Sequence, residues 1–232
     1  VEVDERRRAI DEGHRASAEA GKLIDAEREF RATLSDRTIP ADRKATLLTP
    51  GDYDEVSPSW SPDGKEIVCS TAGTSVPQNR NNTPSKLWIV NVESGARRLL
   101  CENDAMQPAW SPNGHRIAFW FMPPSVGRSD IATVSKAGGE IEVITKDGST
   151  NWNPVWSPDG KFLYFVSDRD GKGLTNIWRV SENGGTAERI TSFKNGDVRW
   201  PAISADGRAI VFEHDFGIWK LDVSSKKTTP IK

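Results

Sequence analysis

Apolar and polar positions follow one order four times between residues 53 and 232. The third occurrence is the clearest. The turn Ser157-Pro158-Asp159-Gly160 separates a short apolar segment from a long one, and Asn183-Gly184-Gly185 forms a second hairpin turn. Apolar and alternating segments on both sides of such turns are typical of antiparallel strands. The strands predicted for this copy are residues 153–156, 161–167, 176–180 and 187–191.

The other copies repeat this order around Ser61-Pro62-Asp63-Gly64, Ser111-Pro112-Asn113-Gly114 and Ser204-Ala205-Asp206-Gly207. The turn glycines are about 46 to 50 residues apart, a period that indicates a repeat architecture. Four antiparallel strands per unit predict an all-β fold, a β-propeller of four-stranded blades. Because one blade cannot bury both of its faces, Trp and aliphatic side chains are expected to fill the seams between blades. The predicted blades are about 53–101, 102–145, 146–191 and 192–232.

The remaining strands are predicted by matching each copy to the third. Their third and fourth strands alternate in the same way as those of the third copy. The predictions are 65–71, 86–92 and 97–101 in the first copy, 115–121, 130–136 and 141–145 in the second, and 208–214, 217–223 and 228–232 in the fourth.

Residues 1–40 have a different pattern and are predicted to form a helical segment or linker. Charged residues dominate, and Leu23, Phe30 and Leu34 fall on one side of a helical wheel. Two readings remain open: a docking segment for a partner, and a solvated helix that rests on the domain or links it to other sequence. Ile39-Pro40 ends the helix.

The Trp-Ser-Pro-Asp-Gly-Lys pattern followed by an apolar strand resembles the WD-like repeat of TolB-type β-propellers. The resemblance covers residues 44–232 and rests on three well-preserved copies. The last unit, from Asp197 to Leu221, is similar to blades in the N-terminal propeller of tricorn-like serine proteases. TolB-like propellers have six blades, so the resemblance implies a ring larger than the four units recognised here.

The segment 44–49 reads like a fourth strand, although no first three strands precede it. Four complete blades and one additional outer strand do not make a regular closed ring. One interpretation is that additional blades or self-association complete the ring. The competing interpretation is a four-bladed ring that strand 44–49 closes. An open array would leave strand edges and an apolar face exposed, which natural proteins avoid.

Composition narrows the function classes. The net charge of −2 gives no reason to expect a nucleic-acid partner. No apolar run is long enough to span a membrane. Cys69 and Cys101 are expected in the second and fourth strands of one blade, too far apart for a disulfide, and are interpreted as buried apolar residues. Because the chain starts at Val1 without an apolar signal segment, export cannot be judged from it.

Few motifs point to chemistry, so no catalytic residue, cofactor or metal is predicted. The Gly-x-Ser-x-Gly elbow of hydrolases is absent from the sequence. His115 follows a turn glycine where Lys or Arg stands in the other copies, and is expected to be exposed. Asp168-Arg169-Asp170-Gly171 looks like the start of a calcium loop but lacks the later glutamate.

The loops between second and third strands differ most among the copies and are the predicted binding face. Three arginines, one from each of three such loops, would suit an acidic peptide or a carboxylate. A second cluster is Glu213-His214-Asp215, read as a polar group at the propeller mouth, although adjacent strand residues point to opposite faces. The candidate binding residues on the loop face are Arg80, Asn81, Arg128, Asp168, Arg169 and Asp170.

These features predict a non-catalytic module that binds a protein or peptide through loops on one face. The alternative is the propeller region of a tricorn-like serine protease, which would guide peptides to a catalytic domain elsewhere. A sugar- or small-molecule enzyme using the axial channel has only residues 213–215 in its favour. The TolB resemblance favours a periplasmic location, and the tricorn resemblance a cytoplasmic one.

Overall fold

The computed structural model describes residues 48–49, 54–72, 84–123, 127–171 and 173–231. The chain divides into two compact units, residues 1–48 and 49–232, and only the second is described beyond a single residue. The helical segment 1–40 and most of the strand predicted at 44–49 lie outside the described residues and stay predictions. Within the described ranges, no helix has the length and apolar character needed to cross a bilayer.

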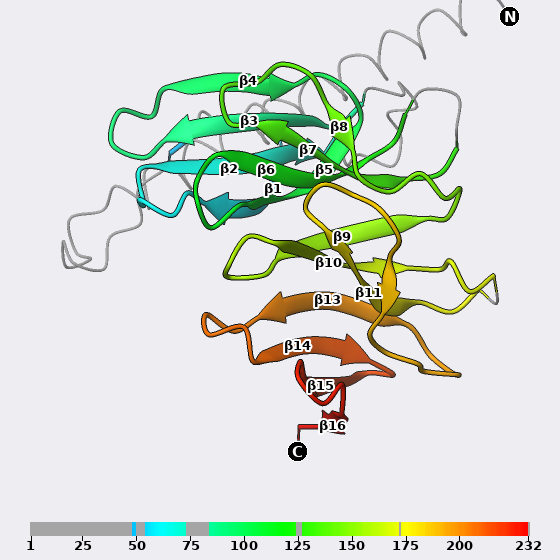
Figure 1. Cartoon of the computed structure of the whole chain (residues 1–232). Coiled ribbons are helices and arrows are strands. Elements are labelled where there is room, and N and C mark those ends of the chain that lie inside the picture. Colours follow the sequence, from blue (N-terminus) through cyan, green and yellow to red (C-terminus); the bar gives the residue numbers. More distant parts are fainter. Residues whose placement is uncertain (1–47, 50–53, 73–83, 124–126, 172, 232) are drawn as a thin grey trace, which may run out of the picture. The chain divides into compact units, whose positions relative to one another are not determined.

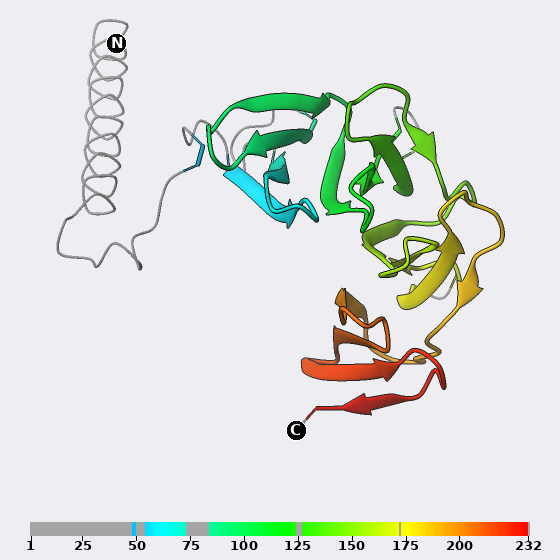
Figure 2. The same cartoon turned by 60° about the vertical axis from the view of Figure 1, so that its left-hand side comes forward.

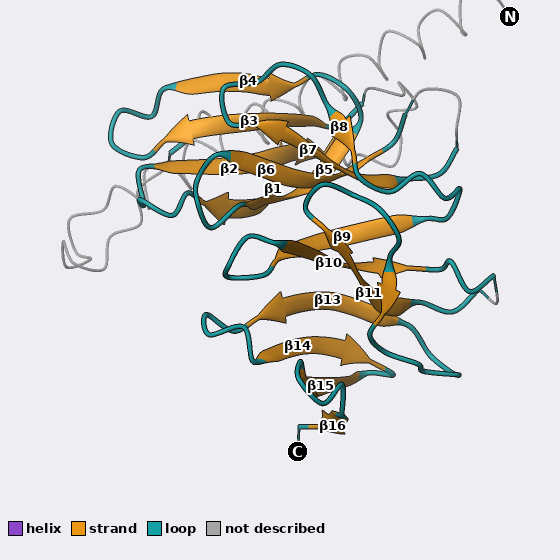
Figure 3. Cartoon of the chain, viewed as in Figure 1, coloured by secondary structure: helices purple, strands orange, loops and turns teal. Residues whose placement is uncertain are grey.

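The described part of the second unit is all-β, which confirms the predicted fold class (Figures 1 and 3). Its strands form four separate antiparallel sheets of four strands, each built from strands consecutive in the sequence. The strands are β1 (Asp54–Trp60), β2 (Glu66–Ala72), β3 (Lys86–Asn91), β4 (Arg97–Cys101), β5 (Ala105–Trp110), β6 (Arg116–Phe121), β7 (Asp130–Ser135), β8 (Glu142–Val143), β9 (Asn151–Trp156), β10 (Phe162–Ser167), β11 (Asn176–Ser181), β12 (Glu188–Arg189), β13 (Val198–Ile203), β14 (Ala209–His214), β15 (Gly217–Asp222) and β16 (Thr228–Pro230).

The four sheets are the blades, and they stand side by side in chain order (Figure 2). The first strands β1, β5, β9 and β13 contact one another in turn, whereas the fourth strands of neighbouring blades have no comparable contact. The first strand of each blade is therefore the inner one, as expected in a propeller. The first and fourth blades are at the two ends of this row.

Each seam between neighbouring blades is an apolar core. We call the face of a blade toward the next blade in sequence its forward face, and the opposite one its rear face. Between the third and fourth blades, Tyr164 and Val166 on the forward face pack with Ile210 and Phe212 on the rear face. The other two seams are built from the same positions, with Val68 facing Ile117, and Ala118 facing Leu163. The period-two alternation of the strands thus supplies both faces.

A four-times repeated hydrogen-bond unit closes the first turn of every blade. In the third blade the Ser157 hydroxyl donates to Asp159 Oδ1 at 2.6 Å and accepts from the backbone N–H of Phe162 at 3.0 Å. Asp159 Oδ1 also accepts from the N–H of Lys161 at 3.1 Å. The hydroxyl lowers the pKa of the Asp159 carboxyl, because the hydrogen bond favours the charged form. The same contacts are made by Ser61, Ser111 and Ser204 with Asp63, Asn113 and Asp206.

These turns also meet one another across the seams. The turn glycines have φ near +70°, which only glycine adopts without strain. A Cβ atom at Gly207 would come within 3.2 Å of the Pro158 ring of the preceding blade. Pro112 lies in the same way beside Gly160. One end of the row of blades is therefore built from repeated turns, and the variable loops lie at the opposite end.

The fourth strands of the second and third blades are shorter than predicted, because a threonine side chain takes over part of the pairing. In the fourth blade, β16 ends at Pro230. In the second blade, Thr145 Oγ1 accepts from the N–H of Ile131 at 2.9 Å and donates to Asp130 Oδ1 at 2.8 Å. In the third blade, Thr191 makes the same two contacts, with Asn176 in the place of Asp130. Burial raises the pKa of Asp130, and the hydrogen bond from Thr145 opposes that rise.

Cys69 in β2 and Cys101 in β4 are free and buried, with β3 between them, as predicted. Burial raises the pKa of the Cys69 thiol to about 11. A thiol with so high a pKa is almost entirely protonated at neutral pH and is therefore a poor nucleophile. His115 is exposed, also as predicted.

The turn unit generates a first prediction. Ser157→Ala should lower the free energy of unfolding by about 1–2 kcal/mol, because it leaves a part-buried N–H without its acceptor. Ser204→Ala is the matched control: its contacts have the same lengths, but Ser204 is less buried than Ser157, so water replaces more of the lost hydroxyl and the loss should be smaller. Denaturant titration measures both. Equal losses, or none at Ser157, would contradict this role of the turn.

The hydrogen bond between Thr145 and Asp130 generates a second prediction. Asp130→Asn keeps the acceptor for Thr145 and removes a carboxylate whose charged form is disfavoured by burial. Because the folded-state pKa is raised, ionisation of Asp130 reduces stability as pH rises. The variant should therefore melt at a higher temperature than the parent at pH 7, and the difference should vanish below the ordinary carboxyl pKa of 3.8.

The third blade supplies the reverse substitution as a control. Asn176→Asp places a carboxylate at a fully buried site with the same threonine contact and should lower the melting temperature at pH 7. Thermal melts of both variants between pH 3 and 7 measure the effect. A lower melting temperature for Asp130→Asn at pH 7 would show that the carboxylate stabilises the blade.

Candidate functional site

Four of the six residues predicted for the loop face lie in the part of the chain that the structure describes. Arg80 and Asn81 lie outside the described residues, and Arg128 is exposed beside β7. The other three, Asp168, Arg169 and Asp170, are in the loop between β10 and β11. Only this last loop can therefore be built up contact by contact.

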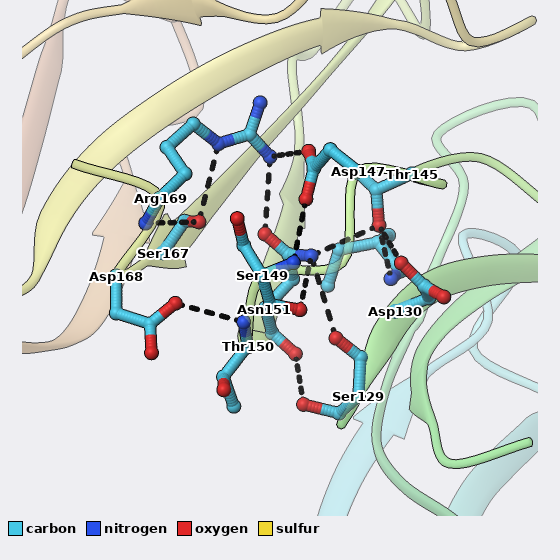
Figure 4. A network of polar contacts seen from close by, with 11 residues as sticks. Ser129, Asp130, Thr145, Asp147, Ser149, Thr150, Asn151, Ser167, Asp168 and Arg169 are labelled. Atoms are coloured by element: carbon cyan, nitrogen blue, oxygen red, sulfur yellow. Dashed lines mark hydrogen bonds and ion pairs between the residues drawn. The ribbon is translucent and has the colours of Figure 1, made fainter. Parts of the chain in front are cut away.

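Arg169 is the centre of a polar network at the seam between the second and third blades (Figure 4). Its Nη2 lies 2.8 Å from Asp147 Oδ2 and donates to Asn151 Oδ1 at 3.0 Å, and its Nε donates to Ser167 Oγ at 3.2 Å. Asn151 in turn accepts from the Ser129 hydroxyl at 2.8 Å through its backbone carbonyl. The network thus ties β7, β9 and β10 together.

The guanidinium of Arg169 is packed as well as paired. Its side chain is only 13% exposed, and it lies 5.0 Å from the ring of Phe165 and 4.8 Å from that of Trp178. Burial lowers the pKa of Arg169, and Asp147 and neighbouring aspartates oppose that shift. Arg169 therefore orders the seam through contacts within the chain.

The two aspartates beside it are engaged in a similar way. Asp168 Oδ1 accepts from the N–H of Thr150 at 2.8 Å, and Asp170 pairs with Arg189 at 2.5 Å. Both contacts lie within the chain. Among the described residues, no group of three or more His, Cys, Asp or Glu side chains is arranged to hold a metal ion.

The cluster Glu213-His214-Asp215 is divided between two faces and a turn. His214 is buried on the rear face of the fourth blade, with its ring 3.8 Å from that of Phe193. Glu213 pairs with Ile218 on the forward face, and Asp215 is exposed in the tight turn before β15. These side chains point apart, as the alternation of a strand requires.

A cavity of about 550 Å³ lies next to the Arg169 network, along the outer side of the same seam. This volume is in the range of ligand pockets in proteins. Its walls are residues 142–147 of the second blade, and Arg169, Trp178 and residues 183–187 of the third. Glu142 pairs with Arg116 at 2.5 Å and Asp147 with Arg169, so the acidic groups on its walls are largely neutralised.

Trp178 forms part of this wall, and its side chain has a hydrogen-bond donor without a partner. Its ring lies 4.8 Å from the guanidinium of Arg169 and 5.7 Å from that of Arg189. Its Nε1 is buried and has no acceptor among the residues that the structure describes. A buried unpaired donor costs about 1–3 kcal/mol. Trp110 Nε1 and His214 Nδ1 are also unpaired, but neither residue lines the cavity.

The inner strands carry a feature that the sequence reasoning missed. Each has a β-bulge, and a non-glycine residue there has φ between 51° and 54°. Each of these residues precedes a proline, which lacks the N–H needed for regular pairing. These prolines could therefore have predicted the bulges from the sequence. The general expectation that Trp side chains fill the seams is wrong for Trp200, which is 60% exposed. The bulge residues are Ser57, Gln107, Asn153 and Trp200.

Comparison with known proteins agrees with this architecture. The sequence pattern of the TolB beta propeller domain matches residues 41–231. No curated protein is similar enough to the chain to count as a relative. Among solved structures, TolB from Acinetobacter baumannii matches with a TM-score of 0.65 and 22% identity, over 78% of this chain and 44% of that one. The chain thus spans less than half of that protein.

Two further structures share the fold. A puromycin-hydrolysing peptidase from Mycobacterium tuberculosis matches with a TM-score of 0.59 and 18% identity, over 79% of this chain and 32% of the peptidase. The structure of a nidogen/laminin complex matches with a TM-score of 0.65 and 11% identity, over 85% of this chain and 72% of the matched one. At these identities the likeness concerns the fold. The match over residues 41–231, together with four sheets of the expected topology, shows that the chain belongs to the TolB β-propeller family.

Proposed function

We propose that this chain is a non-catalytic module that binds a protein or peptide, and that the cavity between the second and third blades takes an extended segment of the partner. The observation that carries the proposal is the cavity of about 550 Å³ itself, which has strand β8 and the aromatic side chain of Trp178 in its walls.

The backbone around the cavity suits an extended peptide. Strand β8 is the last strand of its sheet, so its outer edge has no neighbouring strand within the described part of the chain. An added peptide strand pairs with such an edge, and pockets beside the edge select its side chains. Val143, Ile144 and Ala187 supply apolar surface next to the Trp178 ring. The neutralised charges on the walls favour an uncharged segment over an acidic one.

The comparisons support a binding role on general grounds. One matched structure is a complex of nidogen with laminin, so the shared fold occurs in a protein that binds a protein partner. The predicted loop face remains an alternative position for the site, with Arg128 as an exposed cation among its described residues.

A second candidate function follows from the peptidase match. The chain corresponds to about a third of the puromycin-hydrolysing peptidase, and its last blade resembles those of tricorn-like proteases. In that case the propeller would guide peptides to a catalytic domain outside residues 1–232. Sequencing the gene beyond the codon for Lys232 separates the two proposals, because only the second requires a catalytic unit with a nucleophilic serine.

Peptide selection tests the binding proposal. A random heptapeptide phage library is panned on the chain, and the selected peptides are titrated against Trp178→Phe, which reduces the aromatic surface in the cavity wall. Loss of this apolar contact should weaken binding about fivefold. Trp219→Phe, in the seam of the fourth blade, is the matched control and should bind as the parent does.

The outcome also locates the site. Unchanged affinity in Trp178→Phe together with a loss in Arg128→Ala would move the site to the loop face and refute the cavity. Failure to select any peptide that saturates the chain would refute the binding function itself.

A further inference from the structure

The outer strand of the second blade, β8, directs main-chain groups to an open edge next to the cavity. The Ile144 N–H donates to the carbonyl of Ile131 in β7 at 2.8 Å. Val143 lies opposite Ala132 in the same register. Hydrogen-bonded and non-hydrogen-bonded residue pairs alternate along an antiparallel ladder. The N–H and C=O of Val143 therefore point away from β7, to the side where the described sheet has no further strand.

This edge does not depend on where the row of blades ends. The second blade has the first blade on its rear face and the third on its forward face, and both seams are filled with apolar side chains. The fourth strand of a propeller blade is the outermost one, so an additional blade covers a face of its neighbour and leaves this edge as it is. The open edge is therefore a property of the second blade itself.

In the third blade, a charged side chain closes the equivalent edge. Ile190 makes the backbone hydrogen bond that Ile144 makes in the second blade. Arg189, the residue before it, therefore stands at the position of Val143. Its Nε donates at 2.8 Å to the carbonyl of Thr191, so the side chain folds back along its own strand. Charged side chains on an edge strand hinder pairing with another chain.

The fourth blade closes the same position with a proline. Ile231 makes the equivalent backbone hydrogen bond there at 2.8 Å, and Pro230 precedes it at the position of Val143. Proline has no N–H to donate to an added strand. In the first blade, β4 begins with the exposed Arg97 and Arg98. The second blade has an aliphatic residue with a free direction for its N–H at the place where two other blades have a block.

The cavity lies on the forward side of this edge. Ile144 belongs to the seam with the third blade, whereas Val143 packs toward the seam with the first. Side chains directly opposite one another on paired strands share a face of the sheet. In a strand added to β8, the residues before and after the one level with Val143 would therefore direct their side chains into the cavity, toward Trp178.

The charged side chains that line the cavity balance one another. Two are acidic, Glu142 and Asp147, and two are basic, Lys146 and Arg169. The cavity thus has no net charge that would attract a charged side chain, and burying a charge there costs free energy. An apolar side chain instead gains from removing its surface, and that of Trp178, from water.

We propose that the partner segment is an added strand that pairs through its main chain with Val143 and places an uncharged, apolar side chain in the cavity beside Trp178. This inference rests on the proposed function and adds the pairing position and the kind of side chain. The N–H and C=O of Val143 form two hydrogen bonds with the added strand. Because β8 has only two residues and Glu142 pairs with Thr133, Val143 fixes the register.

A proline substitution tests the pairing. Val143→Pro removes the outward N–H but leaves the bonds between β7 and β8 in place, since the neighbouring residues make them. Pro230 shows that this position of a blade accepts proline. Val143→Ala, which keeps the N–H, is the matched control, and thermal melts check that both variants fold. Heptapeptides selected on the parent chain should bind Val143→Pro at least about tenfold more weakly than Val143→Ala.

Two measurements on the parent chain complete the test. Saturation with a selected peptide should slow hydrogen exchange of the Val143 amide, whereas the Ile144 amide, already bonded to Ile131, should change little. The peptides are also remade with one N-methyl group at each position in turn. Binding should be lost at the residue that donates to the Val143 carbonyl, and replacing an apolar residue next to it with Glu should weaken binding about tenfold.

Failure of this inference is distinguishable from failure of the proposed function. Equal affinities of Val143→Pro and Val143→Ala, with unchanged exchange of the Val143 amide, would overturn the pairing and leave a peptide site in the cavity. Undiminished binding of every Glu-substituted peptide would overturn the apolar side chain. If no heptapeptide saturates the parent chain, the binding function itself is refuted.

Discussion

Each blade of this chain has two apolar faces, and it is stable in water only when both are covered. A sheet with alternating side chains presents apolar residues on both sides when both sides are buried. The three seams meet this requirement with the same positions each time, such as Phe119, Phe165 and Phe212 on successive rear faces, which are all completely buried. The order of the blades, the inner position of their first strands and the separation of turn end from loop end follow from repeating this contact.

The repeat made most of this architecture predictable from the sequence. The turn Ser157-Pro158-Asp159-Gly160 carries its own hydrogen bonds, so its structure depends on local chemistry. The shortened fourth strands were not foreseen, because the hydroxyl of Thr191 competes with backbone pairing only once β11 is in place. The bulges were missed although each is followed by a proline, since the prolines were interpreted only as part of short strands.

The candidate site was less predictable, because it depends on contacts between blades. In the sequence, Arg169 is a loop cation between two aspartates and suggests ligand binding. In the structure it pairs with Asp147, which is 22 positions away in the chain, and stacks on Trp178. The unpaired N–H of Trp178 cannot be recognised from an alternating strand pattern, since its environment is supplied by the neighbouring blade. The proposed binding site is therefore at a seam between blades, where single-strand patterns carry no signal.

The central claim is that the apolar seams between neighbouring blades hold this architecture together. Hydrogen exchange of backbone amides, compared between the parent and Phe165→Ala, tests it most directly. Because Phe165 packs in the seam between the second and third blades, the substitution should speed exchange in β6 and β7 of the second blade as well as in β10 and β11 of the third. Faster exchange confined to the third blade would contradict the account.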